Sequence, residues 1–156
     1  MKKTIVAVIG TSSASSEEAA AAEHVGRLVA ERGWVLVTGG LGGVMEAASK
    51  GASEAGGAVV GILPHGDSSR ANAHVQIPIA TNMGFARNAI IAHTADALIA
   101  VGGAYGTLTE ISMALNLGKP VFGINTWEIK GVRQMPDAES AINACASSVV
   151  RSGTTT

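Results

Sequence analysis

Short runs rich in Val and Ile alternate with helix-like segments along this chain, and this alternation restricts the fold more than any other feature. A β-branched run closed by a turn residue indicates a buried strand, and apolar residues three and four apart indicate a helix. The runs that predict strands are 4–10, 34–40, 58–63, 75–80, 97–103 and 120–125. The segments that predict helices are 15–33, 43–57, 82–95, 107–118 and 137–150. This order favours βαβ units and a doubly wound parallel sheet, an α/β fold.

Several local signals mark where these elements begin and end. Ser15 and Glu18 have the spacing of a capping box, so we expect the first helix to begin there. Asn82 is expected to cap the third helix. Pro78 places the fourth strand at an edge of the sheet or at a strand end. The polar segment 64–74 shows no apolar periodicity and is expected to be a surface loop.

The composition fits one three-layer αβα domain. Hydrophobic residues make up 47% of the chain but aromatic residues only 3%, so the core must consist of Val, Ile, Leu and Ala. That is the usual filling of a parallel sheet covered by helices. Neither a repeat nor a linker interrupts the pattern. We therefore predict a single domain over residues 1–150 and a flexible tail over residues 151–156.

Charge and patterning exclude several classes of protein. The net charge of −1 argues against nucleic acid as a partner, because nucleic-acid binders usually present a basic surface. No apolar run approaches the ~20 residues of a membrane span, so no membrane partner is expected. The apolar run after the first lysines is too short for a secretory signal. Cys145 is the only cysteine and is expected to be a buried thiol. Together these features predict a cytoplasmic protein.

The sequence does not match the common cofactor motifs. The first predicted strand leads into "GTSSAS", which lacks the GxGxxG of a dinucleotide site, and no GxxxxGK[ST] or GxSxG is present. The four histidines show no ligand spacing, so we expect no metal. No cofactor is required by any of these patterns.

Glycine-rich segments instead follow three of the predicted strands. In a parallel sheet, ligands bind beyond the carboxyl ends of the strands. Glycine lets the backbone approach an anion closely, and the first turn of a helix presents unpaired N–H groups to it. We therefore predict a phosphorylated small molecule as the ligand, in a cradle with two halves, although the glycines could also serve only to make tight turns. The predicted ligand-binding residues are Gly10, Thr11, Ser12, Gly39, Gly40, Gly42, Gly43, Arg87, Gly103, Gly106, Thr107 and Glu110.

Two charged residues have a structural and a functional interpretation each. Arg87 lies near the start of the third helix and could bind a phosphate through two N–H groups, or lie exposed to solvent. Thr107 is expected to cap the fourth helix and to donate to a phosphate oxygen. Glu110, three residues later, could complete a capping box with Thr107. Alternatively, Glu110 holds a ribose hydroxyl or assists cleavage of a glycosidic bond.

At this point the sequence resembles a known family. The segment "GGAYGTLTE" (102–110) is similar to the PGGxGTxxE signature of the Lonely Guy (LOG) family, whose members were long described as lysine decarboxylases, an activity we do not expect here. "TGGLGGVMEAASKGA" (38–52) resembles the first glycine loop of that family, and "MGFARN" (83–88) resembles the segment that carries its Arg-Lys pair. Order and spacing agree over roughly residues 4–125. The compact length of the chain and the segment "VGGAYGTLTE" resemble the molybdenum-cofactor-carrier-like branch of the family more than its cytokinin-activating enzymes.

This resemblance implies a Rossmann-like fold that assembles into a homodimer or homotetramer. LOG enzymes hydrolyse the N-glycosidic bond of nucleoside 5′-monophosphates such as AMP or cytokinin riboside monophosphates. Their carrier-like relatives bind molybdenum cofactor without turning it over. By position, Gly103, Gly106 and Thr107 would hold phosphate. Arg87 and Glu110 would be the catalytic pair of an enzyme.

Departures from the family pattern favour binding over catalysis. Gly102 stands in place of the proline of the signature, and Ala104 in place of its second glycine. Asn88 stands in place of the lysine of the Arg-Lys pair, so a cation beside the phosphate is missing. We therefore expect a carrier or sensor of a phosphorylated, nucleotide-like ligand. A phosphoribohydrolase is the alternative, because Arg87 and Glu110 are both present.

Overall fold

The computed structural model describes residues 1–152, and residues 153–156 lie outside the described part. In the described part, seven parallel strands form one sheet in the order β4-β3-β2-β1-β5-β6-β7. The strands are β1 (Ile5–Gly10), β2 (Val35–Thr38), β3 (Ala58–Leu63), β4 (Ile77–Ala80), β5 (Ala97–Val101), β6 (Val121–Ile124) and β7 (Val132–Gln134). The predicted α/β doubly wound parallel sheet is thereby confirmed.

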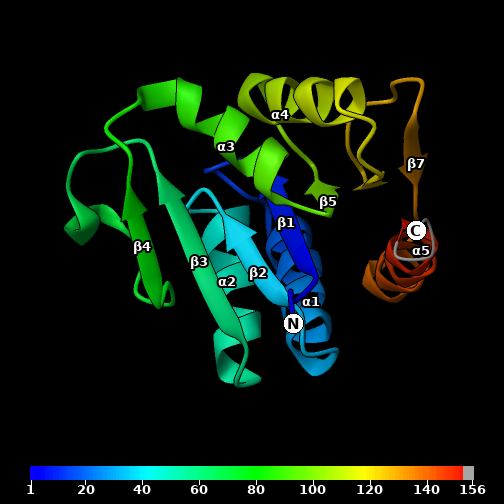
Figure 1. Ribbon diagram of the computed structural model, residues 1–156, viewed down its shortest axis with the longest axis horizontal. Coiled ribbons are helices and arrows are strands. Elements are labelled where there is room, and N and C mark those ends of the chain that lie inside the picture. Colours follow the sequence, from blue (N-terminus) through cyan, green and yellow to red (C-terminus); the bar gives the residue numbers. More distant parts are fainter. Residues whose placement is uncertain (153–156) are drawn as a thin grey trace.

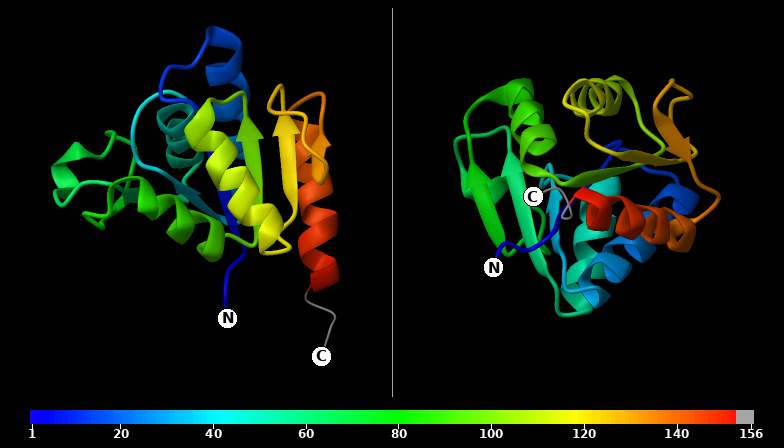
Figure 2. Two further views of the ribbon diagram at one scale, coloured as in Figure 1. Left: turned by 90° about the horizontal axis from the view of Figure 1, so that it is seen from above. Right: turned by 45° about the vertical axis from the view of Figure 1, so that its right-hand side comes forward.

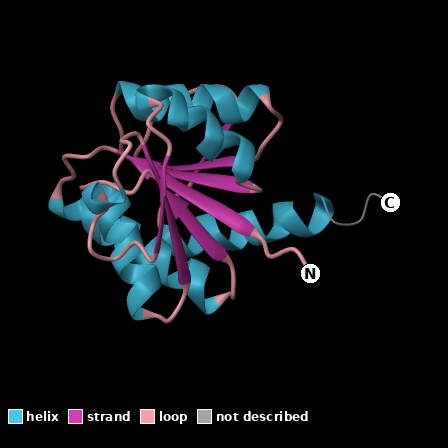
Figure 3. Ribbon diagram, turned by 60° about the vertical axis from the view of Figure 1, so that its left-hand side comes forward, coloured by secondary structure: helices cyan, strands magenta, loops and turns pink. Residues whose placement is uncertain are grey.

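Helices cover both faces of the sheet (Figure 1). The α-helices are α1 (Ser16–Glu31), α2 (Val44–Glu54), α3 (Arg87–Thr94), α4 (Tyr105–Asn116) and α5 (Ala138–Ser152), and the short 3-10 turns are η1 (Ser68–Arg70) and η2 (Gly84–Ala86). Helices α1, α2 and α5 pack on one face and α3 and α4 on the other, which the turned views show from two sides (Figure 2). The three layers and the twist of the sheet are clear when elements are coloured by type (Figure 3).

Alternate residues of each central strand supply two separate cores. Val6 and Val8 of β1 point to the face covered by α1, α2 and α5, whereas Ala7 and Ile9 point to the face covered by α3 and α4. All four side chains are essentially inaccessible to solvent. Strands buried on both faces read as continuous apolar runs, which is why the sequence predicts them well.

Several predicted local features agree with the structure. Ser15 and Glu18 form the capping box at the start of α1. Strand β4, which contains Pro78, is an edge strand. Cys145 is fully buried, and burial raises the pKa of its thiol to about 12. The thiol is therefore protonated and packed within the core.

The structure differs from the prediction at the starts of two helices and in one additional strand. Helix α3 begins at Arg87, not at Asn82, because Asn82 has a φ of 53° and donates its backbone N–H to the His65 carbonyl instead of capping a helix. Helix α4 begins at Tyr105, with Ala104 as its N-cap, so Thr107 lies inside the helix and does not cap it. Strand β7 was not predicted, because it has only three residues, and these are largely exposed at the edge of the sheet opposite to β4.

Helices α1 and α2 touch backbone to backbone through two glycines. A Cβ on Gly26 of α1 would lie 2.0 Å from the Ala48 carbonyl oxygen, and a Cβ on Gly51 of α2 would lie 2.0 Å from the Glu23 carbonyl oxygen. No side chain fits at either point. This close contact fixes α2, and with it the loop that precedes α2, against the rest of the layer.

The contact predicts that Gly26→Ala destabilises the protein. Alanine favours a helix over glycine by about 1 kcal/mol, but the added methyl group must push two backbones apart. We expect the free energy of unfolding to fall by roughly 2 kcal/mol, as for an overpacked core. Urea denaturation measures this change. Gly42→Ala is the control, because its Cβ would meet only the Ser12 carbonyl oxygen at 3.6 Å, and equal loss of stability in both variants would contradict the prediction.

Candidate functional site

The order of strands reverses at β1, and the largest group of predicted site residues gathers there. Strand β1 leads along the chain to β2 on one side, whereas β5 lies on its other side, so the loops after β1 and β5 diverge at the carboxyl edge. Ligands of doubly wound sheets bind at such a switch point. A cavity of about 240 Å³ lies here. It is lined by Gly10, Thr11, Ser12, Leu41, Met45, Phe85, Arg87, Asn88, Ala104, Gly106, Thr107 and Glu110.

The first turn of α4 opens into this cavity. The turn from β5 is made by Gly102 and Gly103, which both have positive φ, and Ala104 caps the helix without a side-chain hydrogen bond. The first hydrogen bond of the helix runs from the Leu108 N–H to the Ala104 carbonyl oxygen, at 3.1 Å. The N–H groups of residues 105–107 come before this bond, in the first turn of the helix. Gly106 has open space where a Cβ would stand. Such a helix end attracts an anion.

Arg87 is buried, with 8% of its surface exposed, which excludes the interpretation as a solvated arginine. Its Nε donates to the Ile62 carbonyl oxygen at 2.9 Å and its Nη2 to the Gly39 carbonyl oxygen at 3.4 Å. Its Nη1 donates to the side-chain oxygen of Asn88. A guanidinium carries five N–H donors, so this network orients it without using all of them. Asn88 thus helps to hold the Arg87 guanidinium in place.

Glu110 lies in the cavity wall with 7% of its surface exposed. Burial raises the pKa of its carboxyl to about 7, and the charge of Arg87 only partly opposes this shift. Burial in turn lowers the pKa of Arg87, and the charge of Glu110 opposes that shift. Because Ala104 is the N-cap of α4, the capping-box interpretation of Glu110 is wrong. The buried carboxyl therefore has no structural role in starting the helix.

The second glycine segment contributes apolar side chains to the cavity wall. Gly39, Gly40, Gly42 and Gly43 do not themselves line the cavity, which Leu41 and Met45 of the same stretch reach instead. The glycines allow close packing: a Cβ on Gly43 would lie 2.3 Å from the Thr11 carbonyl oxygen. A phosphate contact by these glycines stays a prediction, and so does one by Gly103, which also lies outside the lining.

The loop at 64–74 supports the cavity from outside. The Asn72 side chain donates to the Leu41 carbonyl oxygen at 2.9 Å, and the Asn72 backbone N–H donates to the Gly40 carbonyl oxygen at 2.9 Å. These contacts could not be predicted from the sequence, because the segment 64–74 has no apolar periodicity. The apolar lining by Leu41, Met45 and Phe85 was not predicted, because the segments that contain these residues were assigned to the site only through their glycines and Arg87.

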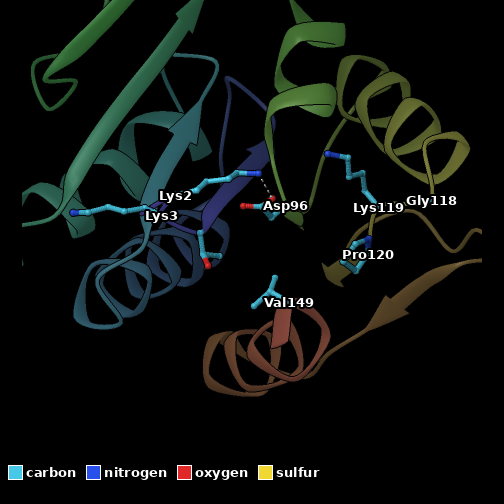
Figure 4. Close-up of a pocket in the computed structure, with 8 residues that line it drawn as sticks. Lys2, Lys3, Asp96, Gly118, Lys119, Pro120 and Val149 are labelled. Carbon is cyan, nitrogen blue, oxygen red and sulfur yellow. Dashed lines mark hydrogen bonds and ion pairs between the residues drawn. The ribbon is translucent and has the colours of Figure 1, made fainter. Parts of the chain in front are cut away.

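A larger hollow of about 400 Å³ lies at the opposite, amino edge of the sheet (Figure 4). Three of its four charged groups are bound to the protein. Lys2 pairs with Asp96 at 3.3 Å, and Asp96 also accepts the Ile5 N–H at 2.8 Å. Lys119 Nζ donates to the carbonyl oxygens of His93 at 3.1 Å and Ala95 at 2.6 Å at the end of α3. We interpret this hollow as structural and the carboxyl-edge cavity as the site.

Fold and site together define a Rossmann-like protein with a cavity at the switch point of its sheet, next to the first turn of α4. Residues 3–150 match the SLOG cluster4 family, and the chain belongs to that family. In the residues that the structure describes, no helix has the length and apolar character needed to cross a membrane.

Known proteins similar to this chain include carriers of a metal cofactor. The molybdenum cofactor binding protein of Rippkaea orientalis is 36% identical, with a TM-score of 0.90 over 94% of this chain and 98% of that one. The Moco carrier protein of Chlamydomonas reinhardtii is 34% identical, with a TM-score of 0.88 over 96% and 99%. An uncharacterized protein of Archaeoglobus fulgidus is 49% identical over 97% of this chain and 100% of its own length. The resemblance to the carrier-like branch is confirmed.

The raised pKa of Glu110 predicts a pH-dependent cost to stability. An unfolded glutamate titrates near 4.5 and the folded one near 7, so the folded state binds more protons between these values. Stability therefore falls as the pH rises through this window. We expect Glu110→Gln to unfold with a free energy roughly 3 kcal/mol higher than wild type at pH 8, and with a difference below about 1 kcal/mol at pH 5.

Urea denaturation at the two pH values measures this difference. Glu46→Gln is the matched control, because Glu46 is exposed in the first turn of α2, and we expect it to change stability by no more than about 0.5 kcal/mol at either pH. If the gain from Glu110→Gln were the same at pH 5 and pH 8, the carboxyl would not titrate as predicted.

Proposed function

We propose that this protein binds a phosphorylated, nucleotide-like small molecule in the carboxyl-edge cavity, as a carrier or sensor. The observation that carries the proposal is the first turn of α4, whose N–H groups, open Gly106 and buried Thr107 border the cavity. Two similar proteins are described as binding or carrying molybdenum cofactor. Molybdenum cofactor, which carries a phosphate, is accordingly our first candidate ligand, and an AMP-like nucleotide is the second.

The other walls of the cavity fit the same role. Arg87 adds a positive charge that is already oriented by the Ile62 and Gly39 carbonyls and by Asn88. Glu110 supplies a carboxyl that can accept hydrogen bonds from hydroxyl groups next to the phosphate, or donate one while it is protonated. A dimer or tetramer and a cytoplasmic location stay predictions that accompany this proposal.

One observation favours a hydrolase as the second candidate function. A carboxyl with a pKa of about 7 in a cavity is suited to accept or donate a proton at neutral pH. In hydrolysis of a nucleoside 5′-monophosphate, water would add to C1′ as the C1′–N bond breaks, which releases the base and ribose 5-phosphate. Glu110 would take one proton of the water and return it to the departing base, which leaves with the electron pair of the C1′–N bond, or its carboxylate would stabilise positive charge at C1′.

Incubation with AMP separates the two functions. A carrier binds molybdenum cofactor or AMP and leaves AMP intact, as chromatography of the mixture would show. Release of free adenine by the wild type that disappears in Glu110→Gln would establish the hydrolase instead. A melting temperature that neither ligand raises at 100 times its expected dissociation constant would contradict both, because such binding should add about 2.7 kcal/mol of stability.

Replacement of Thr107 tests the phosphate end of the site. Thr107→Val keeps the shape of the buried side chain and removes the hydroxyl, so we expect at least about tenfold weaker binding of AMP, the scale of a hydrogen bond to a charged group. Thr109→Val is the matched control, since Thr109 lies on the exposed face of the same helix and donates to the Tyr105 carbonyl oxygen. Calorimetric titration measures both, and equal losses would contradict the assignment.

A further inference from the structure

The turn before α4 has little in its own sequence to fix its shape. Gly102 and Gly103 both have positive φ, and Ala104 caps the helix without a side-chain hydrogen bond. Glycine has the most backbone freedom of any residue, so two in succession give a turn with many accessible conformations. The N–H groups of residues 105–107 follow this turn directly, and their direction depends on it. Contacts from outside the turn must therefore hold it.

The loop after β6 supplies these contacts through two adjacent side chains. The Thr126 hydroxyl donates to the Gly102 carbonyl oxygen at 2.5 Å. The Trp127 indole N–H donates to the Ala104 carbonyl oxygen at 3.1 Å. The Gly102 N–H in turn donates to the Ile124 carbonyl oxygen at 2.9 Å. Neither Thr126 nor Trp127 lines the carboxyl-edge cavity, so both act on the backbone of the turn and not on the space for a ligand.

These two side chains are themselves held in place. The Gln134 side chain on β7 donates to the Trp127 carbonyl oxygen at 3.0 Å. The rings of Trp127 and Tyr105 have centroids 6.0 Å apart and planes tilted by 31°. Thr126 packs on the backbone of β6, where a Cβ on Gly123 would lie 2.4 Å from the Thr126 Cγ2. The short edge strand β7 thus anchors the loop that supports the turn.

The Trp127 contact acts on the peptide unit that opens α4. The Ala104 carbonyl oxygen accepts two hydrogen bonds, one from the Trp127 indole and one from the Leu108 N–H. The Tyr105 N–H belongs to the same peptide unit and, in a planar trans peptide, points opposite to that carbonyl. Hydrogen bonds in a chain polarise one another, so a carbonyl that accepts two of them makes the attached N–H a better donor to an anion. Trp127 therefore both aims and strengthens a donor at the open end of the helix.

We propose that Trp127 and Thr126 are positioning residues for the anion site, because they hold the first turn of α4 in the geometry that binds a phosphate. The proposal rests on the proposed function and adds to the site two residues from outside the cavity. Their effect passes through the Ala104 and Gly102 carbonyls to the backbone N–H groups. It is therefore independent of the group attached to the phosphate, and it applies equally to inorganic phosphate and to AMP.

Calorimetric titrations of wild type and variants with inorganic phosphate and with AMP test the proposal. Trp127→Phe keeps a ring beside Tyr105 and removes the indole N–H, and Thr126→Val keeps the side-chain shape and removes the hydroxyl. We expect each to weaken the binding of both compounds by the same factor, about fivefold, the scale of one hydrogen bond. Trp34→Phe is the matched control and should bind as wild type, because Trp34 lies at the amino end of β2 and packs on Arg32. Circular dichroism checks that each variant is folded at the temperature used.

Tryptophan fluorescence adds a measurement that a purely structural role would not change. The chain has two tryptophans, so Trp34→Phe leaves Trp127 as the only one. Indole emission responds to the hydrogen bond and the electric field at its N–H group. A phosphate at the first turn of α4 polarises the Ala104 peptide, so we expect Trp127 emission to change in step with the calorimetric binding curve. Trp127→Phe, which keeps only Trp34, should show no change.

The outcomes distinguish the positioning role from the phosphate site itself. Unchanged affinity for both compounds in Trp127→Phe and Thr126→Val would overturn the positioning role and leave the phosphate site standing. A loss for AMP alone would also overturn it, because Trp127 would then contact the ligand beyond its phosphate. Constant Trp127 emission at saturating phosphate would overturn it as well. Absence of binding of either compound by folded wild type would overturn both proposals. If Trp127→Phe does not fold, Thr126→Val and the emission of Trp34→Phe decide the question.

Discussion

The close contact between the loop after β1 and the start of α2 determines which side of the switch point stays open as a cavity. The Val44 N–H donates to the Thr11 carbonyl oxygen at 3.0 Å, and a Cβ on Gly43 would lie 2.3 Å from that same oxygen. This loop is thereby fixed on one side by α2. The first turn of α4, on its other side, remains open to the cavity. The glycine segment before α2 therefore packs tightly against the loop after β1. The glycine segment before α4 instead leaves backbone N–H groups facing the cavity.

The buried Arg87 and Glu110 are the second constraint. A charged carboxyl in the cavity wall lowers the stability of the fold at neutral pH, as the raised pKa of Glu110 shows. Arg87 is held by backbone carbonyls and by Asn88. Groups that cost stability and do not build the fold are typical of functional sites. The same pair fits a carrier, which would use it to bind, and a hydrolase, which would use it to move a proton.

The sequence predicted the order of most elements because buried parallel strands and capped helices leave periodic signals. It also predicted that Arg87, Thr107 and Glu110 would share one edge, since each follows a strand of the same sheet. It could not predict the start of α3, where a positive φ at Asn82 overrides its capping preference, nor the three-residue β7. The apolar walls at Leu41 and Phe85 were also missed. Their positions follow from tertiary contacts, which leave no pattern in a single sequence.

Asn72 has a consequence for how related chains can diverge. Its two hydrogen bonds tie the loop at 64–74 to the backbone of Gly40 and Leu41, and Leu41 forms part of the cavity wall. A substitution or insertion in this loop can therefore move the wall while the glycine turn before α4 keeps its geometry. The loop that positions this wall and the glycine turn before α4 are separate segments of the chain. Selection can therefore alter the shape of one wall of the cavity through the loop and leave the turn unchanged.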